Sequence, residues 1–242
     1  MRFSIVTVAL NAAKTLPATL QSVSEQRFDS FEHILWDGGS TDETLAIARS
    51  FPHVKIVEGR DRGIADAMNK GAAHAQGEFL LHLHADDLLA HPEVLHYVDT
   101  TLRLHPALSW VYGLVDVIDE KGTLLRRPPL VPFEAKRLRK YNIIPHPATF
   151  VSRALFERMG GFDPDLRYAM DYDLWLRLSS VEQPLLLPTV LAHFREHGGS
   201  LSTSEPRRLN DEVYKVRNRY TRGLWEKWRS YRTWKRRGKC TS

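Results

Sequence analysis

The chain has 242 residues, of which 43% are hydrophobic, so it is long enough to bury one sizeable core. No apolar run approaches the roughly 20 residues that a helix needs to cross a bilayer. The N-terminus enters a strand pattern without the long apolar segment of a signal peptide. A single cysteine, Cys240, excludes a disulfide within the chain and gives no support for a cysteine metal site. These features predict residence in the cytoplasm.

The net charge of +5 is unevenly distributed along the chain. Residues 207–242 contain 13 Lys and Arg against 3 Asp and Glu, a net +10, so the residues before them carry −5. Within this basic segment Trp225, Trp228 and Tyr231 recur every three residues and would form one stripe on a helix. Because aromatic and basic residues together suit an anionic membrane interface, we expect residues 224–237 to contact one peripherally. The alternative is a helix that packs this stripe on the body of the protein.

Strands and helices alternate in the first part of the sequence. Strands are predicted over residues 3–9, 31–37, 54–58 and 78–84, and helices over residues 14–26, 41–50 and 63–75. Thr15 is the expected N-cap of the first helix, with Pro17 in its first turn, and Ser40 or Thr41 is the expected cap of the second. This alternation predicts a parallel sheet with right-handed crossovers.

The pattern changes after about residue 105. Strands are predicted over 109–118, 145–151 and 185–194, helices over 152–159 and 171–180, a turn at 119–122 and a proline-rich loop at 128–132. Residues 205–236 are predicted to form one long helix or two. No linker is long enough to separate independent domains. We therefore expect a catalytic domain over residues 1–204 and a basic, aromatic, helical segment over residues 205–242.

Two adjacent carboxylates, Asp86 and Asp87, follow a buried strand pattern. Carboxylates at the carboxyl end of a central strand lie where open α/β sheets bind ligands. Two such neighbours destabilise one another unless a cation or donor intervenes, and a hard divalent cation favours a phosphate-bearing substrate. His84, on the same face of the predicted strand as Asp86, would join them, whereas His82 is expected in the core. The alternative is a solvated loop that caps a helix.

A second acidic strand end occurs at Asp37, in the segment Asp-Gly-Gly-Ser-Thr-Asp that spans residues 37–42. The glycines permit a tight turn and the close approach of a ligand. Asp37 is placed to accept a hydrogen bond from a nucleobase N–H. Together the two acidic strand ends predict a nucleotide-diphosphate site, and the alternative is an ordinary strand-to-helix loop.

Two further segments carry candidate functional groups. Asp171 and Asp173 begin an amphipathic helix, where the helix dipole stabilises an ionised carboxylate that can act as a general base toward a hydroxyl. Simple N-capping is the alternative. His197 lies in a glycine-rich loop, where a histidine can complete a metal site or hold a phosphate, although most loop histidines do neither.

These segments, in this order, resemble the family two glycosyltransferases of the GT-A fold. The resemblance covers about residues 1–202. The run at residues 61–71 is similar to that of the family's bacterial surface-polysaccharide branch. The resemblance is carried by the opening strand at residues 3–11, the "DGSTD"-like loop at 37–42, the run Asp-Arg-Gly-Ile-Ala-Asp-Ala-Met-Asn-Lys-Gly at 61–71, the D-x-D position at 84–87, and the block at 160–163 with 170–175. The sequence departs from the family at His84, where Asp or Asn is frequent, and at Met170, where Glu is frequent.

The resemblance implies an α/β fold with a mixed sheet flanked by helices. It also implies metal-dependent, inverting transfer of a sugar from a nucleotide-diphosphate sugar to a lipid-linked or saccharide hydroxyl, in cell-surface polysaccharide or glycolipid biosynthesis. Asp37 would contact the base, and Asn11, Asp61, Asn69 and His84 would line the nucleotide-sugar pocket. Asp86 would ligate Mg²⁺ or Mn²⁺ with His197 close to the ion, Asp171 would be the catalytic base, and His146 and Thr149 would form the acceptor wall.

Three alternatives were weighed against this interpretation. A nucleotidyltransferase would need a glycine-rich phosphate loop after the first strand, but residues 10–14 contain no glycine. A protein that binds nucleic acid or an anionic surface through its basic segment is disfavoured by the acidic body. A non-catalytic relative is disfavoured because Asp37, Asp86 and Asp171 are retained.

Overall fold

The computed structural model describes residues 1–198, 205–221 and 234–235. Its strands are β1 (Phe3–Ala9), β2 (Phe31–Asp37), β3 (Val54–Glu58), β4 (Phe79–His82), β5 (Leu88–Leu89), β6 (Trp110–Ile118), β7 (Leu124–Arg126), β8 (Thr149–Ser152) and β9 (Leu185–Arg195). Its helices are α1 (Leu16–Ser24), α2 (Thr44–Arg49), α3 (Ile64–Ala72), α4 (Val94–Leu104), α5 (Ala135–Leu138), the 3₁₀ turn η1 (His146–Ala148), α6 (Arg153–Arg158), α7 (Met170–Ser179) and α9 (Pro206–Tyr220). Within the described ranges, no helix combines the length and the apolar character needed to span a membrane.

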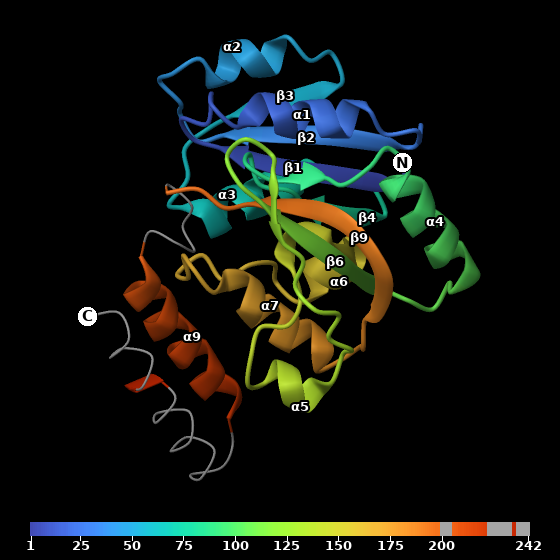
Figure 1. Ribbon diagram of the computed structural model, residues 1–242, viewed down its shortest axis with the longest axis vertical. Coiled ribbons are helices and arrows are strands. Elements are labelled where there is room, and N and C mark those ends of the chain that lie inside the picture. The colour runs from blue at the N-terminus through green and yellow to red at the C-terminus, as the bar shows by residue number, and fades with distance from the viewer. Residues whose placement is uncertain (199–204, 222–233, 236–242) are drawn as a thin grey trace.

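The strands form one mixed sheet with helices on both faces (Figure 1). The strand order is β3-β2-β1-β4-β8-β6-β9-β5, and β7 pairs with β6. β1, β2, β3 and β4 are parallel to one another, whereas β8 runs antiparallel to both β4 and β6. The predicted mixed α/β fold is thereby confirmed.

Alternate side chains of the central strands enter different cores. On β4, Leu80 packs with α3, α6 and α7, whereas Leu81 packs with α1 and α4. On β6, Trp110 packs in the same core as Leu80, and Val111 packs in the same core as Leu81. Burial on both faces explains why these strands are uninterrupted apolar runs in the sequence.

The parallel strands place their carboxyl ends at one edge of the sheet. β1, β2 and β3 have the predicted bounds, and β4 ends at His82, two residues before the predicted end. The loops that leave these strands contain Asn11, Asp61 and Asp86, and Asp37 is the last residue of β2. Parallel strands therefore bring together side chains that are up to 75 positions apart in the sequence, from Asn11 to Asp86.

Two predicted elements begin three or more residues later than predicted. The helix predicted from residue 41 begins at Thr44, because Asp42 accepts hydrogen bonds from both the backbone N–H and the hydroxyl of Thr44. Ser40 and Thr41 are therefore not its caps. The strand predicted over residues 145–151 is the turn η1 followed by β8, because prolines 145 and 147 have no N–H for a central strand ladder.

Several short or amphipathic elements were not predicted at all, namely α4, α5, β5 and β7. The most substantial is α4, which buries Val94, Leu95, Val98 and Leu102 against the face formed by Phe3 and Leu81. It follows the acidic loop after β4, and its burial holds one end of that loop.

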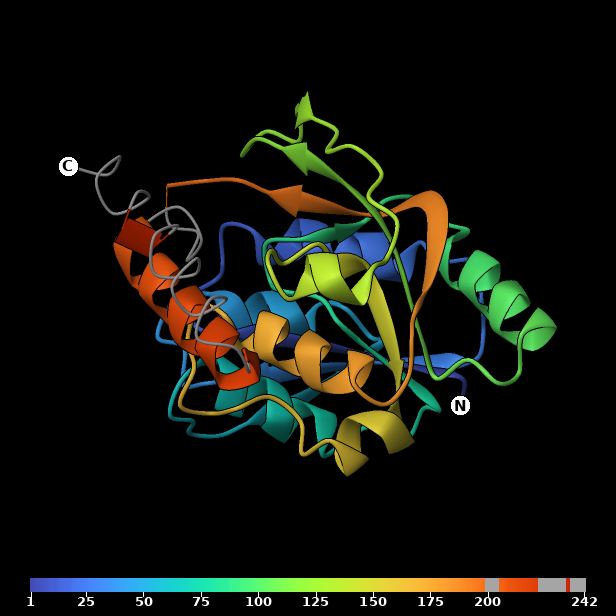
Figure 2. The same ribbon diagram turned by 90° about the horizontal axis from the view of Figure 1, so that it is seen from below.

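The C-terminal helix α9 packs alongside α7 (Figure 2). Val216 of α9 is fully buried in the core that contains Leu174 and Trp175 of α7. Of the segment predicted to contact a membrane, residues 224–233 and 236–237 lie outside the described residues.

Candidate active site

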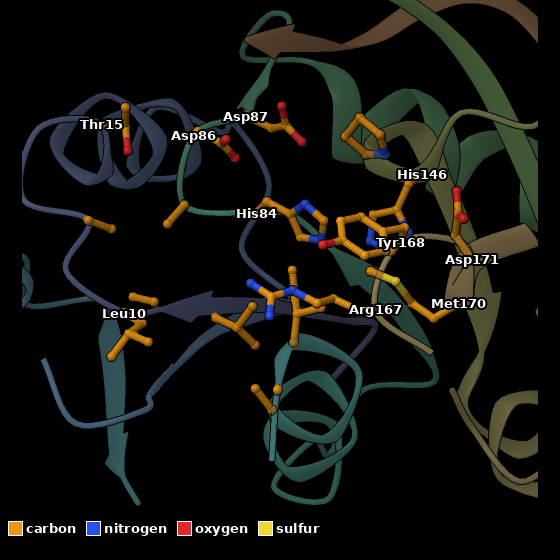
Figure 3. Close-up of a pocket in the computed structure, with 18 of the residues that line it drawn as sticks. Leu10, Thr15, His84, Asp86, Asp87, His146, Arg167, Tyr168, Met170 and Asp171 are labelled. Carbon is orange, nitrogen blue, oxygen red and sulfur yellow. The ribbon is translucent and has the colours of Figure 1, made fainter. Parts of the chain in front are cut away.

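A cavity of about 780 Å³ opens at the carboxyl ends of β1 and β4, beside η1 and the start of α7 (Figure 3). The predicted site residues that line it are Asn11, Asp61, His84, Asp86, His146, Asp171 and His197. Three other predicted residues, Asp37, Asn69 and Thr149, are not among the described residues that line it. The cavity thus joins residues from the first and second halves of the chain.

One end of the cavity holds a cluster of metal-ligating groups. His84, Asp86 and Asp87 each place one ligand atom within 4.8 Å of those of the other two. His197 Nε2 lies 3.0 Å from Asp86 Oδ2. Because β4 ends at His82, it is the loop after the strand, and not a shared strand face, that brings His84 to Asp86. His82 itself is buried against aromatic side chains, as predicted for a core histidine.

Arg195, the last residue of β9, fixes the loop that carries the cluster. Its backbone N–H donates to Asp87 Oδ1 at 3.1 Å, and its Nε donates to the backbone oxygen of Asp86 at 3.0 Å. Its Nη1 donates to the backbone oxygens of Asp119 and Glu120, at 3.3 and 2.8 Å. The sequence analysis missed this buried arginine, although a cation at the end of an apolar strand is a signal in itself.

The electrostatics of the cluster call for a cation. Burial and the neighbouring Asp86 carboxylate raise the pKa of Asp87 well above its ordinary value, and burial lowers the pKa of His84. Asp87 Oδ2 and His84 Nε2 are buried without a hydrogen-bond partner in the described part of the chain. A divalent cation would satisfy both atoms, because it takes carboxylate oxygens and neutral imidazole nitrogens as ligands. The donor set therefore fits Mg²⁺ or Mn²⁺.

Asn11 ties the end of β1 to the loop after β2. Its Oδ1 accepts the backbone N–H of Thr41 at 2.8 Å, and its own N–H donates to Ser40 Oγ at 2.9 Å. Its φ of 52° is a left-handed conformation that Asn tolerates better than most residues. This arrangement leaves Asn11 in the cavity wall while its amide oxygen shapes the loop.

Asp37 lies beneath that loop, with 1% of its surface exposed. Its Oδ2 accepts the backbone N–H groups of Gly39 and Ser40, at 2.9 and 2.8 Å. Its Oδ1 is buried with no partner among the described residues. Asp37 therefore shapes the loop through one oxygen and keeps the other available for a donor.

Asp61 is held in the cavity wall by two donors. Trp36 Nε1 donates to Oδ2 at 3.1 Å, and the backbone N–H of Gly63 donates to Oδ1 at 3.0 Å. A Cβ at residue 38 would stand 2.6 Å from Asp61 Oδ2, so the close approach requires Gly38. The loop after β2 and the residue after β3 thus pack as one unit.

Asn69 joins two motifs, one on α3 and one before α7. Its Nδ2 donates to the backbone oxygen of Phe162 at 2.8 Å, and its Oδ1 accepts the Phe162 N–H at 2.9 Å. A Cβ at Gly161 would stand 2.6 Å from Asn69 Oδ1, and the φ of 66° also favours glycine there. Both ends of the Asn69 amide therefore bind this glycine-containing turn, and its place in the nucleotide pocket stays a prediction.

Asp171 lies at the opposite end of the cavity, in the first turn of α7. Its Oδ2 accepts Asn142 Nδ2 at 2.9 Å, and its Oδ1 accepts the N–H of Tyr172 at 2.6 Å. Burial raises the pKa of Asp171 to about 6, against the lowering effect of these hydrogen bonds. The helix dipole was expected to favour the ionised form, but burial dominates, which makes the carboxylate more basic.

His146 stands between the two ends of the cavity. Its ring centroid lies 4.6 Å from that of His84 and 6.2 Å from that of Trp175. Burial lowers the pKa of His146 well below its ordinary value, and both ring nitrogens are buried without a partner in the described residues. A neutral imidazole facing the cavity can exchange a hydrogen bond with a sugar hydroxyl. Thr149 lies behind it and donates its hydroxyl to the backbone oxygen of Pro145 at 2.6 Å.

Arg167 and Tyr168 also line the cavity, and the sequence analysis missed both. They precede Met170 and Asp171, so their position next to the predicted base was the signal available. The Arg167 guanidinium lies 5.8 Å from the centroid of the Tyr168 ring.

Two solved structures share the fold of this chain. The chain matches S. aureus TarS 1–349 in complex with UDP-GlcNAc with a TM-score of 0.70 at 20% identity, covering 90% of this chain and 65% of that one. It matches the mannosyltransferase PcManGT from Pyrobaculum calidifontis, in complex with GDP-Man and Mn²⁺, with a TM-score of 0.67 at 20% identity, covering 92% and 65%. The chain therefore spans less than two thirds of the length of either structure and has the GT-A glycosyltransferase fold.

Sequence comparison identifies the family. The model of glycosyl transferase family 2 matches residues 4–158, and the chain belongs to this family. It is 38% identical over 210 residues to a PGL/p-HBAD biosynthesis glycosyltransferase of Mycobacterium tuberculosis, covering 83% of this chain and 79% of the relative. It is 29% identical over 183 residues to chondroitin synthase of Escherichia coli, covering 74% of this chain but 26% of that protein.

Proposed function

We propose that this glycosyltransferase is metal-dependent and inverting, and that it moves a sugar from a nucleotide-diphosphate sugar to a hydroxyl acceptor. One observation carries the proposal. A single cavity holds a metal-ligating cluster, His84, Asp86 and Asp87 with His197 beside it, at one end, and a carboxylate of raised pKa, Asp171, at the other. A cation can stabilise the departing diphosphate and a base can activate the acceptor hydroxyl, so the cavity carries a group for each end of the transfer.

Asp86, Asp87 and His84 would hold the ion, with His197 beside Asp86. A divalent cation in this place neutralises negative charge on a departing nucleoside diphosphate. Arg195 orients the Asp87 carboxylate through its backbone N–H and holds the backbone of Asp86 through its Nε. The cluster therefore defines the leaving-group end of the cavity.

Asp171 would take the proton from the acceptor hydroxyl. With a pKa of about 6, about nine tenths of the carboxylate is ionised at pH 7. It is also a stronger base than an ordinary aspartate, and Asn142 holds one of its oxygens in a fixed place. General-base assistance of this kind contributes about 10²–10⁴-fold to a rate.

The arrangement of the two ends supports inversion. Figure 3 shows Asp86 and Asp171 on opposite sides of the cavity, with His84 and His146 between them. A hydroxyl activated at Asp171 would attack the anomeric carbon from the side away from the diphosphate, which inverts its configuration. His146, with its unpartnered nitrogens, would bind a hydroxyl of the transferred sugar or of the acceptor.

The similar proteins agree with this assignment. TarS and PcManGT are solved with UDP-GlcNAc and with GDP-Man and Mn²⁺, which supports a nucleotide-sugar donor and a divalent cation here. The names of the mycobacterial relative and of chondroitin synthase support a role in glycolipid or polysaccharide biosynthesis.

We further propose that this activity occurs in the cytoplasm, at the inner face of the membrane, with residues 224–237 as the membrane contact. Equal liposome sedimentation of the full chain and of a chain truncated after Gly223 would contradict that placement.

Turnover of a panel of UDP-, GDP- and dTDP-sugars with Mn²⁺ tests the proposed function. Release of the nucleoside diphosphate is followed with water or a simple glycoside as acceptor, and the anomeric configuration of the product is assigned by NMR. We expect one donor class to react with inversion, and both Asp86→Ala and Asp171→Asn to slow the reaction by about 100-fold or more. Asp165→Asn, which removes an exposed carboxylate from the segment before α7, is the matched control. Retention of configuration, or equal rates in wild type and Asp86→Ala, would overturn the proposal.

A further inference from the structure

One carboxylate of the C-terminal helix holds the segment that leads into α7. Glu212 Oε2 accepts the backbone N–H groups of Tyr168 at 2.6 Å and Ala169 at 2.9 Å. Both of its oxygens accept the N–H of Arg167, at 3.0 and 3.1 Å. Three consecutive amides therefore converge on one side chain that is 43 to 45 positions away in the sequence. Charge-assisted bonds of this kind are stronger than those between neutral groups.

Further contacts fix α9 itself against the body. Val216, one turn after Glu212, is fully buried. At the far end of the helix, Arg219 and Tyr220 bind Asp173 Oδ1 on α7, at 3.2 and 2.9 Å. Glu212 therefore projects from a helix that is anchored beyond it, and the position of the bound segment is set by the docking of α9.

The held segment presents one positive charge to the cavity. Arg167 is the only Lys or Arg among the described residues that line it, whereas Asp61, Asp86, Asp87 and Asp171 supply negative charge. Within the described part of the chain, Arg167 pairs with no carboxylate, and its side chain is exposed. Figure 3 shows the guanidinium reaching from the side of Met170 and Asp171 across the cavity toward Leu10.

We propose that Arg167 binds the phosphate groups of the donor substrate and that Glu212 is a positioning residue that holds Arg167 over the cavity. A planar guanidinium suits phosphate oxygens because it offers two parallel N–H donors. The phosphate role of Arg167 rests on the proposed function, whereas the holding role of Glu212 rests on the contacts alone. Residues 159–242 lie beyond the match to the family model, so this C-terminal helix adds a control on donor binding that the matched part of the chain does not contain.

The first test is calorimetric titration of UDP, GDP and dTDP with Mn²⁺ into wild type, Arg167→Ala, Glu212→Ala and the double variant. Loss of one charged hydrogen bond to phosphate weakens binding by about tenfold, and we expect this factor from each single variant. Because Glu212 acts through Arg167, the double variant should bind as Arg167→Ala does, not a further tenfold more weakly. Asp211→Ala is the matched control, since Asp211 is the exposed neighbour of Glu212 and contacts Trp234. Wild-type affinity in Glu212→Ala, or multiplied losses in the double variant, would overturn the inference.

The second test is hydrogen exchange of the amides of residues 167–169, which needs no nucleotide. We expect them to exchange at least about tenfold faster in Glu212→Ala than in wild type or Asp211→Ala, because the bound acceptor is gone. Glu212→Gln keeps the shape of the side chain and one acceptor oxygen, so its exchange rate should lie between those of wild type and Glu212→Ala. This variant distinguishes loss of the acceptor from a folding defect. Unchanged exchange would overturn the holding role. If wild type binds no nucleoside diphosphate, the proposed function and the phosphate role of Arg167 fall together, whereas failure of Glu212→Ala alone to change binding removes only this inference.

Discussion

The two halves of the cavity are built in different ways. The donor half, named for the donor binding proposed above, is formed by the ends of β1–β4 and takes its residues from consecutive strand–loop units whose parallel pairing brings them to one edge. The acceptor half, named for the role proposed for Asp171, is formed by η1, residues 167–169 and the start of α7, and it depends on single side chains that reach across long stretches of sequence. Asn142 reaches Asp171 and Glu212 reaches Arg167 in this way. Arg167 belongs to this half by its backbone, but its guanidinium extends across the cavity toward Leu10 and the donor half. Backbone topology therefore fixes the donor half, and particular side chains fix the acceptor half.

The largest effect should come from removing the base of the acceptor half. Asp171→Asn keeps the shape of the side chain but cannot take a proton, so kcat should fall by about 10²–10⁴-fold. The affinity for the nucleoside diphosphate should not change, because the donor half is intact. Steady-state kinetics and calorimetry on the same preparation separate the two quantities. A parallel loss of nucleotide affinity would show that the halves are not separable.

The next effect concerns the polar contact that joins α7 to α9. Asp173, 2% exposed, binds Arg177 at 2.8 Å as well as Arg219 and Tyr220. Asp173→Asn leaves these cations with a neutral partner, and the free energy of unfolding should fall by about 3 kcal/mol. Urea denaturation measures this, with Asp165→Asn as the exposed control. A change below about 0.5 kcal/mol would mean that α9 docks without this contact.

The pH dependence sharpens the role of Asp171. Because the pKa of Asp171 is raised to about 6, kcat should fall about tenfold per pH unit as the pH drops below 6. Asn142 stabilises the ionised form, so Asn142→Leu should raise this pKa and move the acid limb to higher pH.

Burial of the Asp171 charge also costs stability above pH 6, where the folded protein holds an ion that the unfolded chain solvates freely. Asp171→Asn should therefore be more stable than wild type at pH 8, by up to about 3 kcal/mol, and the difference should vanish below pH 4. An acid limb of kcat near pH 4, or equal stability of the two proteins at pH 8, would contradict the burial of the Asp171 carboxylate.

The smallest effect compares two helix caps. Ser152 Oγ accepts the N–H of Leu155 at 3.2 Å and caps α6, so Ser152→Ala should cost about 1 kcal/mol. Thr15 occupies the N-cap position of α1 as predicted, but its side chain makes no capping bond. Thr15→Ala should therefore change stability by less than about 0.5 kcal/mol. Equal costs in thermal unfolding would show that cap geometry does not govern these ends.

The same contrast explains what could be predicted from the sequence. The strands of the donor half are buried runs bounded by turn residues, so β1, β2 and β3 were predicted to the residue. Asp86 and Asp171 were found because each sits in a short acidic motif at the end of a predicted element. Local patterns carry this information without any knowledge of tertiary contacts.

The errors arise where distant contacts decide. The local sequence around Asn69 did not predict that its amide binds Phe162, 93 positions away. Glu212 gave no local signal, since its contacts with residues 167–169 exist only once α9 packs on α7. The strand predicted over 145–151 begins only at Thr149. The prediction followed the apolar pattern of the segment and gave too little weight to its prolines.

Calorimetric titration of the nucleoside diphosphates with and without Mn²⁺, on wild type, Asp86→Ala and Asp171→Asn, tests the two-ended cavity most directly. We expect wild type and Asp171→Asn to bind one nucleotide with the same Mn²⁺-dependent affinity. Asp86→Ala should lose that affinity by at least about 100-fold, since removal even of groups that support metal ligands costs 10–100-fold. Binding that ignores Mn²⁺ and Asp86, or that is lost equally in Asp171→Asn, would contradict a cavity with a metal-bound leaving group at one end and a base at the other.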